Sequence, residues 1–361
     1  MIPSSNPIIG GKSMSENLKE NKIKKTCKNL LGTFIIPVIF IGVLLIICAI
    51  NGREIFPTSA SFSNFVLSAA ITTITTIALS INLNSGRFDF SLGSMAVLSM
   101  VISSKISYLI LNGGSGSAAL MLFFSIIFGL IIGLISGLIY VFLKIPPIIT
   151  SLGVTLILEG ITYTITEGSY ITSEVRNASM TAFNNAWYYS FIIICVVVAL
   201  IIYLFDYTKF GLNYKALKEG QRVSVNTGIK EIPNALICYM ICGGLMGIVG
   251  FLNAARTTLV NGGSLNFGSI SIMFTAFLPM FIGGFIGRYS NDKFGYLLAG
   301  ISMSFLNSTF VVFSNEVNSS TQSIINAVLL VLFLIYLNNE NTIKLLFTGK
   351  LFKKNNKKVE A

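Results

Sequence analysis

Residues 118–142 read AALMLFFSIIFGLIIGLISGLIYVF, an apolar run without one charged side chain. A helix that crosses the hydrocarbon core of a bilayer needs about 20 residues of this kind. Nine further stretches of comparable length and composition recur along the chain, so the sequence predicts an all-α integral membrane protein with about ten transmembrane helices. The expected spans are 31–50, 64–83, 91–111, 118–142, 147–166, 187–206, 233–253, 268–287, 294–314 and 321–337.

The composition of the chain agrees with a membrane location. Of its 361 residues, 53% are hydrophobic and 11% are charged, which is more apolar surface than one globular core of this size can bury. The basic segment 1–28 leads into an apolar run with no small-x-small cleavage site, so we interpret it as a retained signal anchor. The sequence therefore predicts a multi-pass protein of the plasma membrane.

Basic residues fall in alternate gaps between the expected spans. Of the 25 lysines and arginines, 21 lie in the two tails and in every second gap, whereas the other gaps hold only Arg53, Arg176 and Arg256. Because cytoplasmic loops carry the excess of basic residues, both termini and the loop 207–232 are expected in the cytoplasm. The same pattern accounts for the net charge of +11 and implies membrane lipid as a partner, with no nucleic acid.

The chain divides into three parts. Residues 1–28 and 341–361 are basic, polar and poor in aromatic side chains, so we expect two disordered cytoplasmic tails. Residues 29–340 form the expected transmembrane domain. Its two longest gaps are 167–186, which faces outward and has room for a short helix, and the cytoplasmic loop 207–232.

The sequence offers no set of residues for catalysis. The chain has no histidine, and the usual acid–base and nucleophile arrangements cannot be assembled from Asp89, Lys105 and Glu159, the ionisable residues near or at membrane depth. We interpret Cys238 and Cys242, an i, i+4 pair, as packing residues and expect no metal and no cofactor.

The amino-terminal segment resembles a phosphate-binding loop only in part. Gly10, Gly11, Lys12 and Ser13 resemble the end of such a loop, yet Asn6 stands where its first glycine is required. We therefore expect no ATPase site in this chain, and transport rather than catalysis.

Glycine recurs at spacings that let helices approach closely in lipid. Gly129, Gly133 and Gly137 stand four residues apart in one expected span, and residues 243–250 of another carry several more, which predicts close helix contacts there. Two glycine-rich strings also resemble each other. Residues 86–94 read GRFDFSLGS and residues 262–269 read GGSLNFGS, each before a span in a corresponding place of the two halves, as in transporters built from repeats.

The string GRFDFSLGS resembles the G-G-I-D-L-S-V-G-S signature of the permeases of ribose-type ABC importers, the simple-sugar branch that has nucleoside and branched-chain amino acid relatives. Residues 146–153 are similar to the P-F-I-V-T-L-G stretch of that family, and residues 210–229 to its cytoplasmic loop F-G-x-x-x-Y-A-x-G-x-N-x-x-A-A-x-x-S-G-I. Residues 244–256, which end in Ala-Ala-Arg, and the pair 283–284 are similar to the A-G-x-x-x-x-A-R segment and the glycine pair of its later spans.

The chain departs from these patterns in three places. Arg87 stands where the signature has its second glycine, Gly220-Gln221 stands where the loop usually has Asn-Glu, and a second glycine cluster is missing after Gly284. We expect Arg87 to extend to the cytoplasmic interface, where it would pair with Asp89 or with lipid phosphate.

The resemblance covers roughly residues 30–340 and implies a permease that forms a homodimer or heterodimer with a second permease subunit. It implies a cytoplasmic ATP-binding subunit and an extracytoplasmic solute-binding protein as partners. A helix in the loop 207–232, with Leu212, Ala216, Leu217, Val223 and Val225 as apolar anchors, would dock into the ATP-binding subunit. The expected path residues are Gly86, Asp89, Ser91, Gly93, Ser94 and Glu159, and the expected coupling residues are Lys215, Ala216, Gln221, Arg222, Gly228 and Ile229.

Two carboxylates have physical interpretations of their own. Asp89 would complement the positive end of the following helix and cap its free N–H groups, or mark a broken helix start that lines the path. Glu159 should avoid lipid and face protein, water or Lys105, so a structural ion pair and a path-lining role both stay open.

We therefore expect an ABC importer permease that moves a small polar solute into the cell, a monosaccharide such as ribose, while a separate subunit hydrolyses ATP. Nucleosides and branched-chain amino acids are alternative solutes. An ion-coupled secondary transporter is the alternative mechanism, for which Glu159 would be the one candidate coupling carboxylate.

Overall fold

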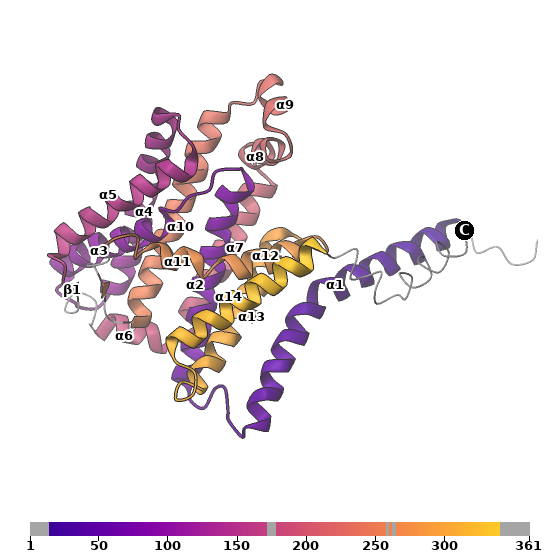
Figure 1. The fold of residues 1–361 in the computed structure, drawn as a ribbon, viewed down its shortest axis with the longest axis horizontal. Helices are drawn as coiled ribbons and strands as arrows, with labels where there is room; N and C mark the ends of the chain where they lie inside the picture. The colour runs from indigo at the N-terminus through magenta and orange to yellow at the C-terminus, as the bar shows by residue number, and fades with distance from the viewer. Residues whose placement is uncertain (1–13, 172–177, 258–259, 262–264, 340–361) are drawn as a thin grey trace, which may run out of the picture.

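The structure is a computed structural model, and it describes residues 14–171, 178–257, 260–261 and 265–339 (Figure 1). Within these residues, ten segments are helical, long and apolar enough to cross a membrane, and they confirm the ten predicted spans. The segments are Asn29–Ile50, Ser59–Asn84, Leu92–Leu111, Ser117–Leu143, Pro147–Thr166, Trp187–Asp206, Glu231–Thr257, Ile270–Gly287, Asp292–Val312 and Ser319–Asn338.

The elements follow one another in an almost entirely helical order. The helices are α1 Met14–Ile50, α2 Ser59–Asn84, α3 Leu92–Leu111, α4 Ser117–Leu143, α5 Pro147–Thr166, α6 Ala178–Asn185, α7 Trp187–Asp206, α8 Lys209–Glu219, α9 Gln221–Asn226, α10 Glu231–Thr257, α11 Ile270–Phe274, α12 Phe277–Gly287, α13 Asp292–Val312 and α14 Ser319–Asn338. The strands are β1 Tyr170–Ile171 and β2 Val260–Asn261.

The amino-terminal tail differs in part from the prediction. Helix α1 begins at Met14, so residues 14–28 continue the first span as helix where we expected a disordered tail. Residues 1–13 and 341–361 lie outside the described residues, and the tail prediction for them stays a prediction.

The two ends of the helix bundle are distinct. One end carries α8 and α9, and we call it the α8–α9 end (Figure 1). The other carries an antiparallel pair in which Tyr170 faces Asn261 and Ile171 faces Val260, and we call it the β1–β2 end. Helix α6 confirms the short helix expected in the gap 167–186.

Helices α2 and α10 form the centre of the bundle. In the spans of these two helices 89% and 78% of the residues are buried, against 22% in the first span and none in α14. In Figure 1, α1 and α14 lie to one side of the other helices. The apolar outer faces of α1 and α14 are therefore left for lipid or for another subunit.

Glycine contacts join α4 to α10, as predicted. A Cβ atom added at Gly129 would overlap the carbonyl oxygen of Gly243, and one added at Gly133 would overlap that of Tyr239. Because any larger residue would force the two backbones apart, these glycines fix the distance between the helices. Cys242 packs beside them against α2, with its Sγ 3.3 Å from the carbonyl oxygen of Ala78.

Candidate functional site: two broken helices and a loop at one end

The signature segment is a turn followed by an irregular stretch between α2 and α3. The backbone N–H of Gly86 donates to Leu83 and that of Arg87 donates to Asn82, each at 3.0 Å. Gly86 has a φ of +73°, which glycine adopts without the steric cost of a side chain. Helix α3 then starts only at Leu92.

Asp89 holds this irregular stretch together. Its carboxylate is 1% exposed and accepts hydrogen bonds from the backbone N–H of Ser91 at 2.9 Å, the hydroxyl of Ser91 at 2.5 Å and the amide of Asn82 at 3.3 Å. Burial raises the pKa of the Asp89 carboxyl, and the bonds from Ser91 and Asn82 oppose this shift. Asp89 thus bonds the residue before α3 rather than the first turn of the helix, and Ser94 Oγ donates to the carbonyl of Ser91 at 2.9 Å.

Glu159 performs a similar task at a second break. It lies in α5, 2% exposed, and accepts hydrogen bonds from Phe267 N at 3.0 Å, Ser269 N at 2.9 Å and Ser269 Oγ at 2.5 Å. The predicted alternative of an ion pair with Lys105 is wrong. Lys105 Nζ donates instead to the carbonyl of Ile165 at 2.8 Å, in the last turn of α5.

The two breaks meet inside the bundle. A Cβ atom at Gly93 would overlap the carbonyl oxygen of Ser269, so the start of α3 lies directly against the residue before α11. Glu159 is about 18 Å along α5 from its first residue, which places this contact well inside the span. The structure therefore brings together the two strings whose likeness suggested a repeat, and Figure 1 shows α3 and α11 side by side.

Phenylalanines that lie near the two breaks in the sequence form an aromatic cluster, which sequence reasoning did not identify. Phe88 lies 4.6 Å from Phe90 and stacks on Phe277 at 5.8 Å, centroid to centroid, while Phe274 lies 6.2 Å from Phe90. Phe274 is 56% exposed. The spacing of these phenylalanines matches that of ordinary packing residues, so no pattern in the sequence indicates that they form one cluster.

Arg87 does not occupy the expected position. The residue is buried, so it does not reach lipid phosphate, and its guanidinium forms an ion pair with Glu231 at 3.8 Å rather than with Asp89. The physical reason is that α10 begins beside this turn and presents Glu231 to it, a contact between residues that are far apart in the sequence.

The loop 207–232 folds into α8 and α9 at one end of the bundle. Thr208 caps α8 by accepting from Gly211 N at 3.3 Å, and Gly211, Tyr214 and Leu217 face the bundle. Tyr214 donates to the carbonyl of Ile81 at 2.8 Å, and burial raises the pKa of its phenol. Leu217 is therefore wrong as an anchor for a partner, because it is already buried against this chain.

Other residues of the loop remain open to a partner. Leu212, Val223 and Val225 are 60%, 69% and 42% exposed. Ala216 is half-buried and Arg222 exposed.

The remaining predicted coupling residues have partners within the chain. Lys215 forms an ion pair with Asp206 at 2.7 Å, and Gln221 Nε2 donates to Glu231 at 2.5 Å. Gly228 has a φ of +94°. Gly228 N donates to Val225 and Ile229 N to Ser224, which is the Schellman arrangement expected of a glycine that ends a helix.

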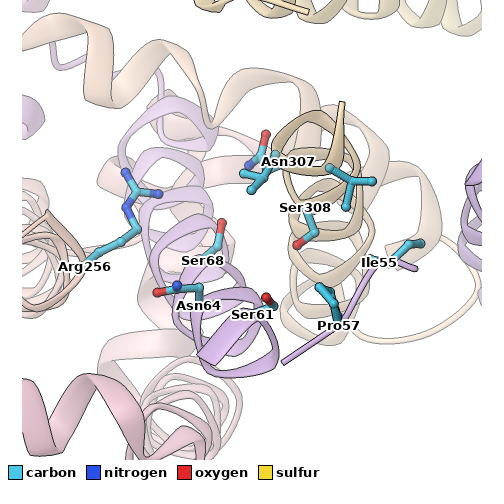
Figure 2. A pocket seen from close by; sticks show the side chains of 10 residues that line it. Ile55, Pro57, Ser61, Asn64, Ser68, Arg256, Asn307 and Ser308 are labelled. Atoms are coloured by element: carbon cyan, nitrogen blue, oxygen red, sulfur yellow. The ribbon is translucent and has the colours of Figure 1, made fainter. Parts of the chain in front are cut away.

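A polar cavity opens near the β1–β2 end, between α2, α10 and α13 (Figure 2). It has a volume of about 480 Å³. Figure 2 shows the hydroxyl and amide side chains of Ser61, Asn64, Ser68, Asn307 and Ser308 along it.

The rest of the lining consists of the guanidinium of Arg256 and the apolar residues Ile55, Pro57, Val311 and Val312. Arg256 reaches the cavity from the end of α10. In the described part of the chain it is exposed and forms no hydrogen bond or ion pair. The cavity can therefore offer a full set of donors and acceptors to a polar ligand.

Comparison with known proteins gives the family. Residues 61–337 match the model of a family described as the branched-chain amino acid transport system / permease component. The chain belongs to this permease family. It is accordingly a multi-pass membrane protein and the permease component of an ABC importer. The permease component family lacks an ATPase domain. Membership of this family implies ATP-binding and solute-binding partners.

Within this permease family the chain is similar to the L-arabinose transport system permease protein AraH of Escherichia coli (strain K12). The two are 27% identical over 262 residues, which cover 72% of this chain and 77% of the relative. The protein of the same name from Shigella flexneri gives the same values. No solved structure matches the chain.

Proposed function

We propose that this permease moves a small polyhydroxylated solute, a monosaccharide such as ribose, into the cell. The observation that carries the solute class is the polar cavity near the β1–β2 end. Its amides, hydroxyls and guanidinium can donate to and accept from several hydroxyl groups at once. Such convergent polar groups set the specificity of small-molecule sites. The likeness to a permease named for L-arabinose transport supports the same class.

The proposed path runs from this cavity toward the two broken helices. Irregular backbone at membrane depth must be buried in protein or line a water-filled cavity. Gly86, Asp89, Ser91, Gly93 and Ser94 form one break, and Glu159 holds the other. Glu159 bonds backbone N–H groups here, which supports a structural role over ion coupling.

The proposed direction follows from the charge pattern. The α8–α9 end carries the basic loop 207–232, so it is the cytoplasmic end, and the polar cavity faces outward. A separate ATP-binding subunit would dock on α8 and α9 and drive the conformational change.

A nucleoside is the second candidate solute. The cluster of Phe88, Phe90, Phe274 and Phe277 could stack on a base, since aromatic faces stack well on flat rings. The same rings could also pack on the apolar face of a sugar, and the hydroxyl and amide groups of the polar cavity support the monosaccharide.

The test replaces amides of the cavity and measures uptake in the native host, which supplies the partners. Asn307→Leu and Asn64→Leu should lower uptake of radiolabelled D-ribose or L-arabinose about tenfold, because each removes an amide that a hydroxyl would pair with. Asn51→Leu is the matched control, since Asn51 is exposed at the same end and bonds only its own helix. Uptake of uridine or leucine, with neither sugar transported, would refute the monosaccharide assignment.

A further inference from the structure

Glu231, the first residue of α10, connects two places that lie far apart in the sequence. Its Oε1 accepts a hydrogen bond from Gln221 Nε2 at 2.5 Å and lies 3.8 Å from Arg87 Nη2. Gln221 is the first residue of α9, and Arg87 belongs to the irregular stretch before α3. One carboxylate oxygen therefore contacts both the loop at the α8–α9 end and the first broken helix.

Gln221 is chemically suited to its contact with Glu231. A glutamate at 221 would place two carboxylates side by side, which is unfavourable. Glutamine donates a hydrogen bond there instead, and Glu231 stays available as the anion for Arg87.

Arg87 depends strongly on this contact. Its side chain is 5% exposed, against 32% for Glu231, and in the described part of the chain its Nη1 atom has no hydrogen-bond partner. A buried cation that loses its counter-ion is left with an uncompensated charge, which is costly. The backbone of Arg87 is also tied to Asn82, which bonds Asp89. A shift of Glu231 would therefore be transmitted to Asp89 and the start of α3.

We propose that Gln221, Glu231 and Arg87 form a positioning relay between α9 and the signature break. A partner that pulls on α9 draws Gln221, and with it the carboxylate of Glu231, away from Arg87. The stretch 87–91 then moves with Glu231, the counter-ion of Arg87. This movement opens or closes the contact between Gly93 and Ser269. The role of the relay in transport rests on the proposed function, whereas its physical coupling does not.

The test of the coupling uses the full chain alone in lipid nanodiscs and measures amide hydrogen exchange at residues 87–91. Gln221→Ala should raise exchange there roughly threefold, although residue 221 contacts none of them, as expected for members of one network. In a Glu231→Gln background, where Arg87 has already lost its counter-ion, Gln221→Ala should have no further effect. Additive effects of the two substitutions would overturn the relay, as would an unchanged exchange rate in Gln221→Ala.

Two further measurements separate the relay from a merely structural role. Glu316→Gln removes the ion pair with Arg53 near the opposite end of the bundle and should leave exchange at 87–91 unchanged. If Glu231→Gln does not fold, Arg87→Gly, which restores the residue of the signature, takes its place in the cycle and should equally abolish the effect of Gln221→Ala.

The role of the relay in transport is tested by uptake and ATP hydrolysis in the native host. Gln221→Ala should lower the solute taken up per ATP hydrolysed several-fold while membrane abundance stays constant. Non-additive exchange with normal transport would leave the coupling standing and remove its role in transport. Loss of all monosaccharide uptake by the unmodified chain would instead refute the proposed function.

Discussion

At the scale of single residues, buried carboxylates in this permease hold irregular backbone rather than pairing with cations. Glu159 accepts three hydrogen bonds from Phe267 and Ser269, and Asp89 accepts three from Ser91 and Asn82. A carboxylate is suited to this task because it has two oxygens that only accept. Both acids thus fix the starts of broken helices.

Replacement of Glu159 by glutamine should destabilise the protein. In the unmodified chain the backbone N–H groups of Phe267 and Ser269 donate to the Glu159 carboxylate. The NH₂ group of glutamine would stand opposite one of these N–H groups and leave a buried donor without an acceptor. One unsatisfied buried donor costs about 1–3 kcal/mol. Thermal unfolding in detergent should therefore begin at a lower temperature than in the unmodified chain. Glu54→Gln, at an exposed position, is the control and should leave the transition in place. An unchanged transition in Glu159→Gln would contradict the structural role.

Sequence reasoning predicted parts of this site for identifiable reasons. Gly86 and Gly228 were identified through the resemblance to the permease family, and the positive φ at both positions accounts for glycine there. The partners of Arg87 and Glu159 were not, because Glu231 and Ser269 come from segments more than a hundred residues away. A packing cluster such as Phe88 with Phe277 likewise leaves no pattern in the sequence.

At the scale of elements, α8 and α9 carry some residues that are buried against the bundle and others that stay exposed. Gly211, Tyr214 and Leu217 dock α8 onto its own chain, whereas Leu212 and Val223 point outward. The sequence showed an amphipathic pattern but not which apolar residues face the bundle, and this is why Leu217 was misassigned. The spans themselves were predicted closely, since about 20 apolar residues specify a crossing locally.

Gly228→Val should uncouple ATP hydrolysis from uptake. The φ of +94° costs a residue with a Cβ atom about 1–2 kcal/mol, and a β-branched residue tolerates it least. The end of α9 would therefore fray and the solute taken up per ATP would fall roughly fivefold, at unchanged membrane abundance. Gly220→Ala, at an extended φ of −170°, should have little effect. Normal coupling in Gly228→Val would tell against a docking role for α9.

At the scale of the whole molecule, a family member without an ATPase domain must receive its energy from another subunit. The purified chain in nanodiscs should therefore not hydrolyse ATP above the background of a mock preparation. ATP hydrolysis that follows the chain through purification and persists after contaminating ATPases are removed would contradict this expectation.

The orientation of the bundle is the prediction on which the proposed direction of transport depends. The positive-inside rule places the α8–α9 end in the cytoplasm, because the basic residues of the loops and tails gather on that side. The structure supplies two exposed reporter positions, Asn226 at this end and Ser319 at the start of α14, on opposite sides of the predicted membrane. In a chain whose 5 cysteines are replaced by alanine, each position can carry a single new cysteine. A membrane-impermeant maleimide should then label Ser319→Cys in intact cells, and Asn226→Cys only after the membrane is permeabilised. The reverse pattern would place the polar cavity on the cytoplasmic side. It would contradict the proposal that this cavity receives the solute from outside the cell.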